Sequence, residues 1–179
     1  MKLQRLKMKL VDKISKDLLE YLQLNSNDIV VPNFYINDYE ADVLRVTNSD
    51  YLIEYEIKTT LLSFKNDFKK GISKNKWYYK YGKSDLKHKL IVEGKRCNRF
   101  FFVCPNNLIP VSEVPSYCGL IYYGNDNVYD RFSIKKNAPL IHKNKVEQEF
   151  YKKLARKLAF REIHWRWKYR MDKESIETF

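Results

Sequence analysis

Hydrophobic residues recur every three or four positions over the first 22 residues of the chain, and charged residues fill the positions between them. This spacing is typical of a helix that buries one face, and the polar cluster at 25–28 marks its end. The sequence therefore predicts an N-terminal helix whose buried stripe consists of Leu3, Leu6, Leu10, Ile14, Leu18, Leu19 and Leu22.

The middle of the chain consists of short segments rich in aromatic and β-branched residues, which favour β-structure. Residues 40–47 and 51–59 are separated by a turn-forming Asn-Ser-Asp segment, so we expect an antiparallel hairpin. Further strands are expected at 99–104, 119–123 and 128–134, which are bounded by Gly, Pro or Asn.

Helical patterns recur in two further places. Ser63 is a suitable N-cap for a short helix that ends near Lys70. From residue 144 onward apolar residues repeat every four positions, and the opposite face is basic. The sequence thus predicts an α/β (α+β-like) fold with a mixed central sheet flanked by helices. The core should span 1–143, with a basic C-terminal helix over 144–179 packed on it.

Composition adds a strong electrostatic bias. The 179 residues include 34 Lys and Arg against 22 Asp and Glu, a formal charge of +12. Such an excess favours polyanionic partners, above all nucleic acid. The longest apolar run, 100–104, is too short for a membrane span, and three cysteines without paired spacing favour the cytoplasm. The glycines form no nucleotide-binding motif, so no small-molecule cofactor is expected.

Two carboxylates and a lysine in the predicted hairpin can share one site. Asp42 lies on the first strand, while Glu56 and Lys58 share a face of the second. Adjacent carboxylates repel each other unless a cation lies between them, and hard oxygen ligands suit Mg²⁺. Lys58 would then orient the attacking water and stabilise charge on a phosphate. Glu-x-Lys is also common on solvated strands, but here the acids lie among apolar neighbours, where an unpaired carboxylate is costly to bury.

The order of these residues resembles the signature of the PD-(D/E)XK nuclease superfamily, in which an Asp and a turn precede Glu-x-Lys on the next strand. A longer resemblance, to the MmcB-like branch and its phage relatives, covers roughly residues 15–123. Its matching segments are 56–58, 63–68, 98–105, 114–115 and 119–121.

The resemblance implies a restriction-endonuclease-like core and a Mg²⁺-dependent endodeoxyribonuclease, for which Mn²⁺ can substitute and whose products carry 5′-phosphate and 3′-hydroxyl ends. The implied metal ligands are the Asp42 and Glu56 carboxylates and the backbone carbonyl of Ile57. An acid of the first helix often joins them, and Glu20 is the first candidate and Asp17 the second. The sequence departs from the family pattern at residues 71–87, which look like an insertion. The resemblance leaves open whether two protomers pair to cut both strands.

Lysines and aromatic residues alternate between the predicted helix at 63–70 and residue 89. Lysines attract phosphates regardless of base sequence, and aromatic rings can stack on unpaired bases. In the C-terminal helix, Trp165 and Trp167 are expected to pack rather than to stack on bases. His88 is expected at the surface. The predicted DNA-binding residues are Lys65, Lys69, Lys70, Lys74, Lys76, Lys87 and Lys89.

Several functions are compatible with these features. The first is a Mg²⁺-dependent DNA nuclease that is structure-selective or weakly sequence-specific. The second is a non-catalytic module that binds nucleic acid or protein through the same fold. The third is an RNA-directed enzyme or an inhibitor of another nucleic-acid machine. The intact set of Asp42, Glu56 and Lys58 favours the first.

Overall fold

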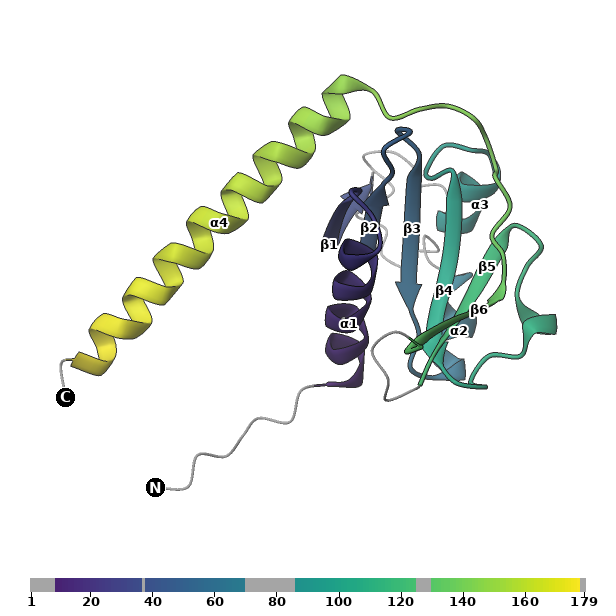
Figure 1. Cartoon of the computed structure of the whole chain (residues 1–179), viewed down its shortest axis with the longest axis horizontal. Coiled ribbons are helices and arrows are strands. Elements are labelled where there is room, and N and C mark those ends of the chain that lie inside the picture. The colour runs from purple at the N-terminus through teal and green to yellow at the C-terminus, as the bar shows by residue number, and fades with distance from the viewer. Residues whose placement is uncertain (1–8, 37, 70–85, 125–129, 178–179) are drawn as a thin grey trace, which may run out of the picture. The chain divides into compact units, whose positions relative to one another are not determined.

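The computed structural model describes residues 9–36, 38–69, 86–124 and 130–177. Six strands form one mixed sheet in the order β1-β2-β3-β4-β5-β6 (Figure 1). β3, β4 and β5 are parallel to one another, and the other neighbouring strands are antiparallel. The strands are β1 (Ile29–Ile36), β2 (Tyr39–Val46), β3 (Leu52–Ile57), β4 (Arg99–Pro105), β5 (Cys118–Tyr123) and β6 (Phe132–Lys136). The helices are α1 (Leu10–Leu24), α2 (Leu61–Asp67), α3 (Lys87–Val92) and α4 (Gln148–Glu177), with a 3₁₀ turn at Val111–Glu113.

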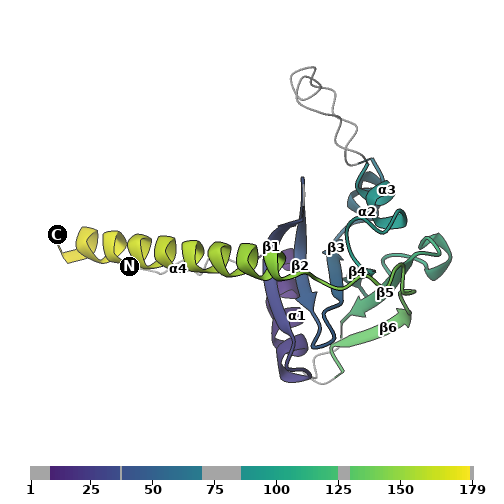
Figure 2. The ribbon, with the colours of Figure 1, turned by 90° about the horizontal axis from the view of Figure 1, so that it is seen from above.

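Helices cover both faces of the sheet. α1 lies on one face, and α2 and α3 lie on the other (Figure 2). α1 buries Ile14, Leu18 and Leu22 against the sheet, as its hydrophobic stripe predicts. Leu10 of the same stripe is 46% exposed, and Leu3 and Leu6 lie outside the described residues. The mixed sheet flanked by helices is the fold class expected from the sequence.

The central strand β4 is buried on both of its faces, which explains its continuous apolar run. Phe101 and Val103 belong to the core cluster under α1. Phe102 points the other way, where its ring centroid is 4.9 Å from that of Phe64 in α2. Phe100 likewise lies 5.5 Å from the His88 ring of α3.

The second face differs in detail from the sequence-based prediction. α2 begins earlier than expected, because Thr60 rather than Ser63 is its N-cap. The Ser63 N–H donates to the Thr60 hydroxyl and the Thr60 N–H to the Ser63 hydroxyl, so the two residues form a capping box. α3 was not predicted, because its six residues are too short to show a helical period.

The chain divides into two compact units, Met1–Lys145 and Val146–Phe179. The second contains α4, and the expected boundary lay between residues 143 and 144. Packing of this helix on the core stays a prediction. Within the described ranges, no helix combines the length and the hydropathy needed to cross a membrane.

A substitution at Gly119 tests the packing between β4 and β5. Gly119 pairs with Phe101 in the register of these strands, and the Phe101 ring occupies the space that a side chain at position 119 would need. A Cβ at this position would also lie 2.8 Å from the backbone nitrogen of Ala138. Gly119→Ala should lower the free energy of unfolding by about 2–3 kcal/mol, measured by urea denaturation. In a Phe101→Leu background the loss should shrink by about 1 kcal/mol. An unchanged loss there would show that the ring is not the obstacle.

Candidate active site

Strand β3 places charged side chains on the face that α2 and α3 cover. Glu54 and Glu56 alternate with Tyr55 and Ile57, which join the core under α1, and Lys58 follows directly after the strand. Glu54, Glu56 and Lys58 expose only 0, 3 and 5% of their surface. Because a buried charge is costly unless it is paired, the fold has to supply counter-charges here.

Two lysines link the acids on this face. Lys58 Nζ lies 2.7 Å from Glu56 Oε1 and 2.6 Å from Asp67 Oδ1. Lys87 Nζ lies 2.6 Å from Glu56 Oε2 and 3.0 Å from Glu54 Oε1. Asp67 is the last residue of α2 and Lys87 is the first residue of α3. Ion pairs therefore join both helices to β3.

Arg96 completes the charge balance. Its guanidinium donates to both oxygens of Glu54, at 2.6 and 2.9 Å, and to the carbonyls of Ile36 and Tyr39 at the turn between β1 and β2. Three cations thus face three anions, and we call this group the ion cluster: Lys58, Lys87 and Arg96 with Glu54, Glu56 and Asp67.

The ion cluster keeps Glu54 and Lys87 charged. Burial alone would raise the pKa of Glu54, but Lys87 and Arg96 outweigh this effect and hold that pKa below its ordinary value. Burial alone would lower the pKa of Lys87, but the neighbouring acids outweigh it and raise the pKa. Both side chains therefore carry their charges at neutral pH.

Asp67 connects the ion cluster to His88. Asp67 Oδ2 is 2.8 Å from His88 Nε2, and His88 Nδ1 is 3.0 Å from the Tyr117 hydroxyl. His88 is only 8% exposed, so the expectation that it lies at the surface is wrong. A continuous chain of polar contacts runs from Lys58 through Asp67 and His88 to Tyr117.

Asp42 lies next to this cluster, just beyond the last residue pair of the β2–β3 ladder. Leu44 pairs with Glu54 in that antiparallel register, so two residues further along Asp42 faces Glu56. Continued register thus places Asp42 opposite Glu56 at the end of the hairpin, where Asp42 turns its carboxylate to the backbone of β3. The Ile57 N–H donates to Asp42 Oδ2 at 2.6 Å.

The environment of Asp42 is unfavourable for its negative charge. The pKa of Asp42 is raised from 3.8 to about 6. Burial is the largest cause and the charge of Glu56 the second, while the Ile57 N–H, Lys58 and Lys87 act in the opposite direction. A cation between the two carboxylates would relieve this repulsion. In an extended strand the N–H and C=O of one residue point to the same side, so the Ile57 carbonyl is directed towards β2 as well.

These oxygen donors are of the type that Mg²⁺ prefers, so the residues fit such an ion in their chemistry. Both Glu56 oxygens, however, already contact a lysine ammonium group. Among the described residues, no group of three His, Cys, Asp or Glu is arranged to hold a metal ion. An ion at this position would have to share Glu56 with Lys58 or Lys87.

An open pocket of about 250 Å³ lies between α1 and this end of the hairpin. Asp42 and Ile57 line it from the sheet, and Asp12, Ser15 and Lys16 line it from α1. Asp12 was not singled out from the sequence, although an acid in the first turn of a helix is the signal that could have identified it.

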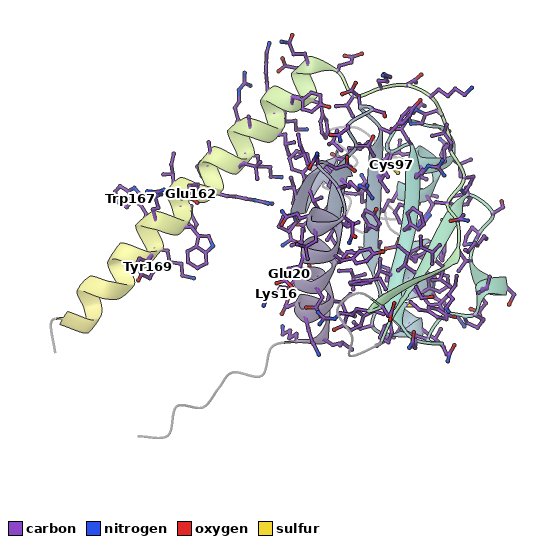
Figure 3. All side chains as sticks on the ribbon, in the orientation of Figure 1. Lys16, Glu20, Cys97, Glu162, Trp167 and Tyr169 are labelled. Carbon is purple, nitrogen blue, oxygen red and sulfur yellow. The ribbon has the colours of Figure 1, made fainter. Side chains whose placement is uncertain are left out.

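The two α1 acids that were predicted to join the site lie elsewhere. Glu20 forms an ion pair with Lys16 at 3.7 Å, is half exposed and does not line the pocket (Figure 3). Asp17 accepts a hydrogen bond from the Tyr123 hydroxyl at 2.7 Å and pairs with Arg131 at 2.8 Å. The rotation of α1 thus places Asp12, rather than either predicted residue, beside Asp42.

The predicted DNA-binding lysines differ in exposure. The prediction for Lys87 is wrong, because its side chain is fully buried among three acids and no phosphate can reach it. Three others are exposed, as a phosphate contact requires: Lys65, Lys69 and Lys89. The remaining three lie outside the described residues: Lys70, Lys74 and Lys76.

Comparison with known proteins shows the fold but not the activity. No known family and no curated protein matches the sequence. The structure is similar to a protein of unknown function from Silicibacter pomeroyi, with a TM-score of 0.57 and 19% identity over 89% of this chain and 90% of that chain. At this identity the likeness establishes the fold alone, so the activity has to be argued from the site.

Removing one cation tests whether the ion cluster holds the fold together. Lys87→Met leaves Glu54 and Glu56 buried with too little positive charge, so the free energy of unfolding should fall by about 3–5 kcal/mol in urea denaturation. Lys89→Met, at an exposed lysine two residues further along α3, should change it by less than about 0.5 kcal/mol. Equal effects of the two substitutions would contradict the assignment.

The raised pKa of Asp42 predicts a pH-dependent change in stability. The folded chain binds this proton up to about pH 6 and the unfolded chain only up to about pH 4, so ionisation of Asp42 lowers stability as the pH rises between these values. In metal-free buffer, Asp42→Asn should therefore raise the free energy of unfolding by about 1–2 kcal/mol at pH 8 and give no gain at pH 4.

The matched control is Asp50→Asn, because Asp50 is a half-exposed acid in a turn. This variant should show no such pH-dependent gain. A loss of stability by Asp42→Asn that is the same at pH 4 and pH 8 would show that the Asp42 carboxylate is not under charge repulsion.

Proposed function

We propose that this chain is a divalent-metal-dependent endonuclease that hydrolyses phosphodiester bonds of DNA. Two observations carry the proposal. The β2–β3 register, continued by one residue, places Asp42 opposite Glu56, whose charge helps to raise the Asp42 pKa, and Lys58 Nζ lies 2.7 Å from Glu56. A pair of acids with an adjacent amine is the arrangement that the resemblance to PD-(D/E)XK nucleases implies. The net charge of +12 supports a polyanionic substrate.

Each residue of the set has a distinct role in this proposal. Asp42, Glu56 and the Ile57 carbonyl would hold Mg²⁺, which when bound supplies an activated water and neutralises charge on the phosphate. Lys58 is fixed by Glu56 and Asp67, so its ammonium can stabilise negative charge that develops on the phosphate without reorganising. Exposed lysines on α2 and α3, on the same face of the sheet, would attract the DNA backbone.

The setting proposed for this reaction is the reducing cytoplasm. The three cysteines are free and buried, which agrees with a compartment where thiols stay reduced.

One observation favours a second candidate, a non-catalytic DNA-binding module on the same fold. Both oxygens of Glu56 are occupied by lysine ammonium groups, and these contacts compete with any metal. If they are stronger than the metal, the chain would bind DNA through its lysines and leave it intact.

Cleavage assays separate the two candidates. The purified chain would be incubated with single-stranded, duplex, nicked and branched DNA and with RNA, in a titration of Mg²⁺ or Mn²⁺. We expect cleavage of at least one DNA substrate, abolished by EDTA. Asp42→Ala and Lys58→Met should each lower the rate by at least about 100-fold while DNA affinity stays largely unchanged.

The matched control is Lys95→Met, which removes an exposed lysine paired with Glu93 and should retain full activity. Undiminished cleavage by both Asp42→Ala and Lys58→Met would contradict the proposal. Salt-sensitive DNA binding that is indifferent to EDTA, without cleavage of any substrate, would establish the second candidate. Cleavage of RNA alone would refute the assignment of DNA as the substrate.

A further inference from the structure

Helix α4 exposes an unusual number of large apolar side chains. The sequence suggested that Trp165 and Trp167 are packed, but they are 70 and 68% exposed. Large apolar side chains that gather in this way mark a surface that binds something. Five such residues lie within ten positions: Phe160, Ile163, Trp165, Trp167 and Tyr169.

These side chains lie on two sides of the helix rather than one. Each residue of an α-helix is rotated by about 100° from the last, so Trp165 and Trp167 point in nearly opposite directions. Tyr169 lies one turn after Trp165 on one side. Phe160 and Ile163 share the other side with Trp167. Trp167 and Tyr169 project from the helix in Figure 3.

The aromatic stretch of α4 and the residues just before it are strongly positive. Residues 152–169 contain seven Lys or Arg and a single acid, Glu162. Glu162 is engaged within the helix, since its carboxylate lies 2.7 Å from Arg166 Nε. The remaining cations are distributed around the helix between the aromatic side chains: Lys152, Lys153, Arg156, Lys157, Arg161 and Lys168.

The positive charge of α4 and the placement of its aromatic side chains on two sides together indicate what binds to this helix. A second copy of the chain would bring two such positive helices together, and like charges repel. A lipid surface contacts one apolar face of a helix and leaves a polar face in water, whereas α4 carries aromatic residues on both sides. A single strand of nucleic acid offers what both features need, because it alternates phosphates with bases that can stack on either side.

An open groove on α4 has the composition that such a strand requires. Phe160, Ile163 and Trp167 provide its apolar walls, and His164 and Lys168 provide its polar rim, around a volume of about 370 Å³. We propose that α4 is a binding site for single-stranded DNA. Unpaired bases stack on Trp165, Trp167 and Tyr169, while Lys168 and the neighbouring basic residues contact the phosphates. This binding goes beyond the proposed hydrolysis and does not depend on it.

Affinity measurements in EDTA test this site independently of any cleavage. The full chain would be titrated with fluorescein-labelled oligo(dT) and with a duplex of equal length, at two salt concentrations. Trp165→Ala and Trp167→Ala should each weaken binding of the single strand by roughly 5- to 100-fold, as the loss of a stacked base predicts. Their affinity for the duplex should change much less.

Two further variants separate stacking from packing. Trp167→Leu keeps an apolar side chain without the aromatic face, so it should lose affinity for oligo(dT) almost as strongly as Trp167→Ala. Ile134→Ala, at an exposed position of β6 remote in sequence from α4, should bind like the unsubstituted chain. Circular dichroism and urea denaturation confirm that each variant is folded.

Several results would overturn the proposal. Unchanged affinity of both tryptophan variants is one, and equal loss for single-stranded and duplex DNA is another. Full binding by Trp167→Leu would show that the indole does not stack. Binding to anionic phosphatidylserine vesicles without binding to oligo(dT) would assign α4 to a lipid surface. A dimer abolished by the same tryptophan substitutions, with DNA affinity unchanged, would assign it to a second copy of the chain.

Discussion

Burial of charge on β3 is the constraint on which the rest of the core depends. Glu54 and Glu56 lie inside the sheet–helix interface, where an ionised carboxylate without a counter-charge would cost several kcal/mol. The fold meets this cost by bringing in Lys87 from α3 and Arg96 from the segment before β4. The cluster therefore fixes how α2 and α3 sit on the sheet, in addition to the aromatic contacts of Phe100 and Phe102.

The same burial of charge determines the electrostatics of the candidate site. Three anions already balance three cations, so Asp42 adds a further negative charge next to a neutral cluster. Its raised pKa reflects burial and the charge of Glu56 that lies across the hairpin. A divalent ion would supply the missing positive charge, and Lys58 would remain close to Glu56 and Asp67. Stability and the proposed chemistry thus depend on the same few side chains.

Patterns between residues close in sequence predicted part of the candidate site. Strand alternation and the Asn-Ser-Asp turn were enough to place Asp42, Glu56 and Lys58 on neighbouring strands, because a hairpin involves residues close in sequence. Asp67 and Lys87 could not be identified in this way. In sequence each resembles an ordinary solvated charge of a helix, and only the packing of α2 and α3 on β3 buries it. Lys87 was assigned to DNA for this reason.

The orientation of the helices about their own axes was the second feature that the sequence did not predict. The hydrophobic stripe of α1 predicts which face is buried, but both polar flanks of that stripe remain possible neighbours of the hairpin. The prediction of Glu20 or Asp17 failed at this point, because Asp12 is the α1 acid that lines the pocket with Asp42. In α4 the stripe was weak because aromatic residues occupy two sides, so the sequence did not show that Trp165 and Trp167 are exposed on the helix.

The proposed chemistry requires Asp42 and Glu56 to share one divalent ion. A crystal soaked in Mn²⁺ and measured at the manganese absorption edge tests this most directly. We expect an anomalous peak at about 2.0–2.3 Å from one oxygen of each carboxylate, with a lysine displaced from Glu56. Full retention of the Lys58 and Lys87 contacts at high Mn²⁺, with no peak between the two acids, would contradict it.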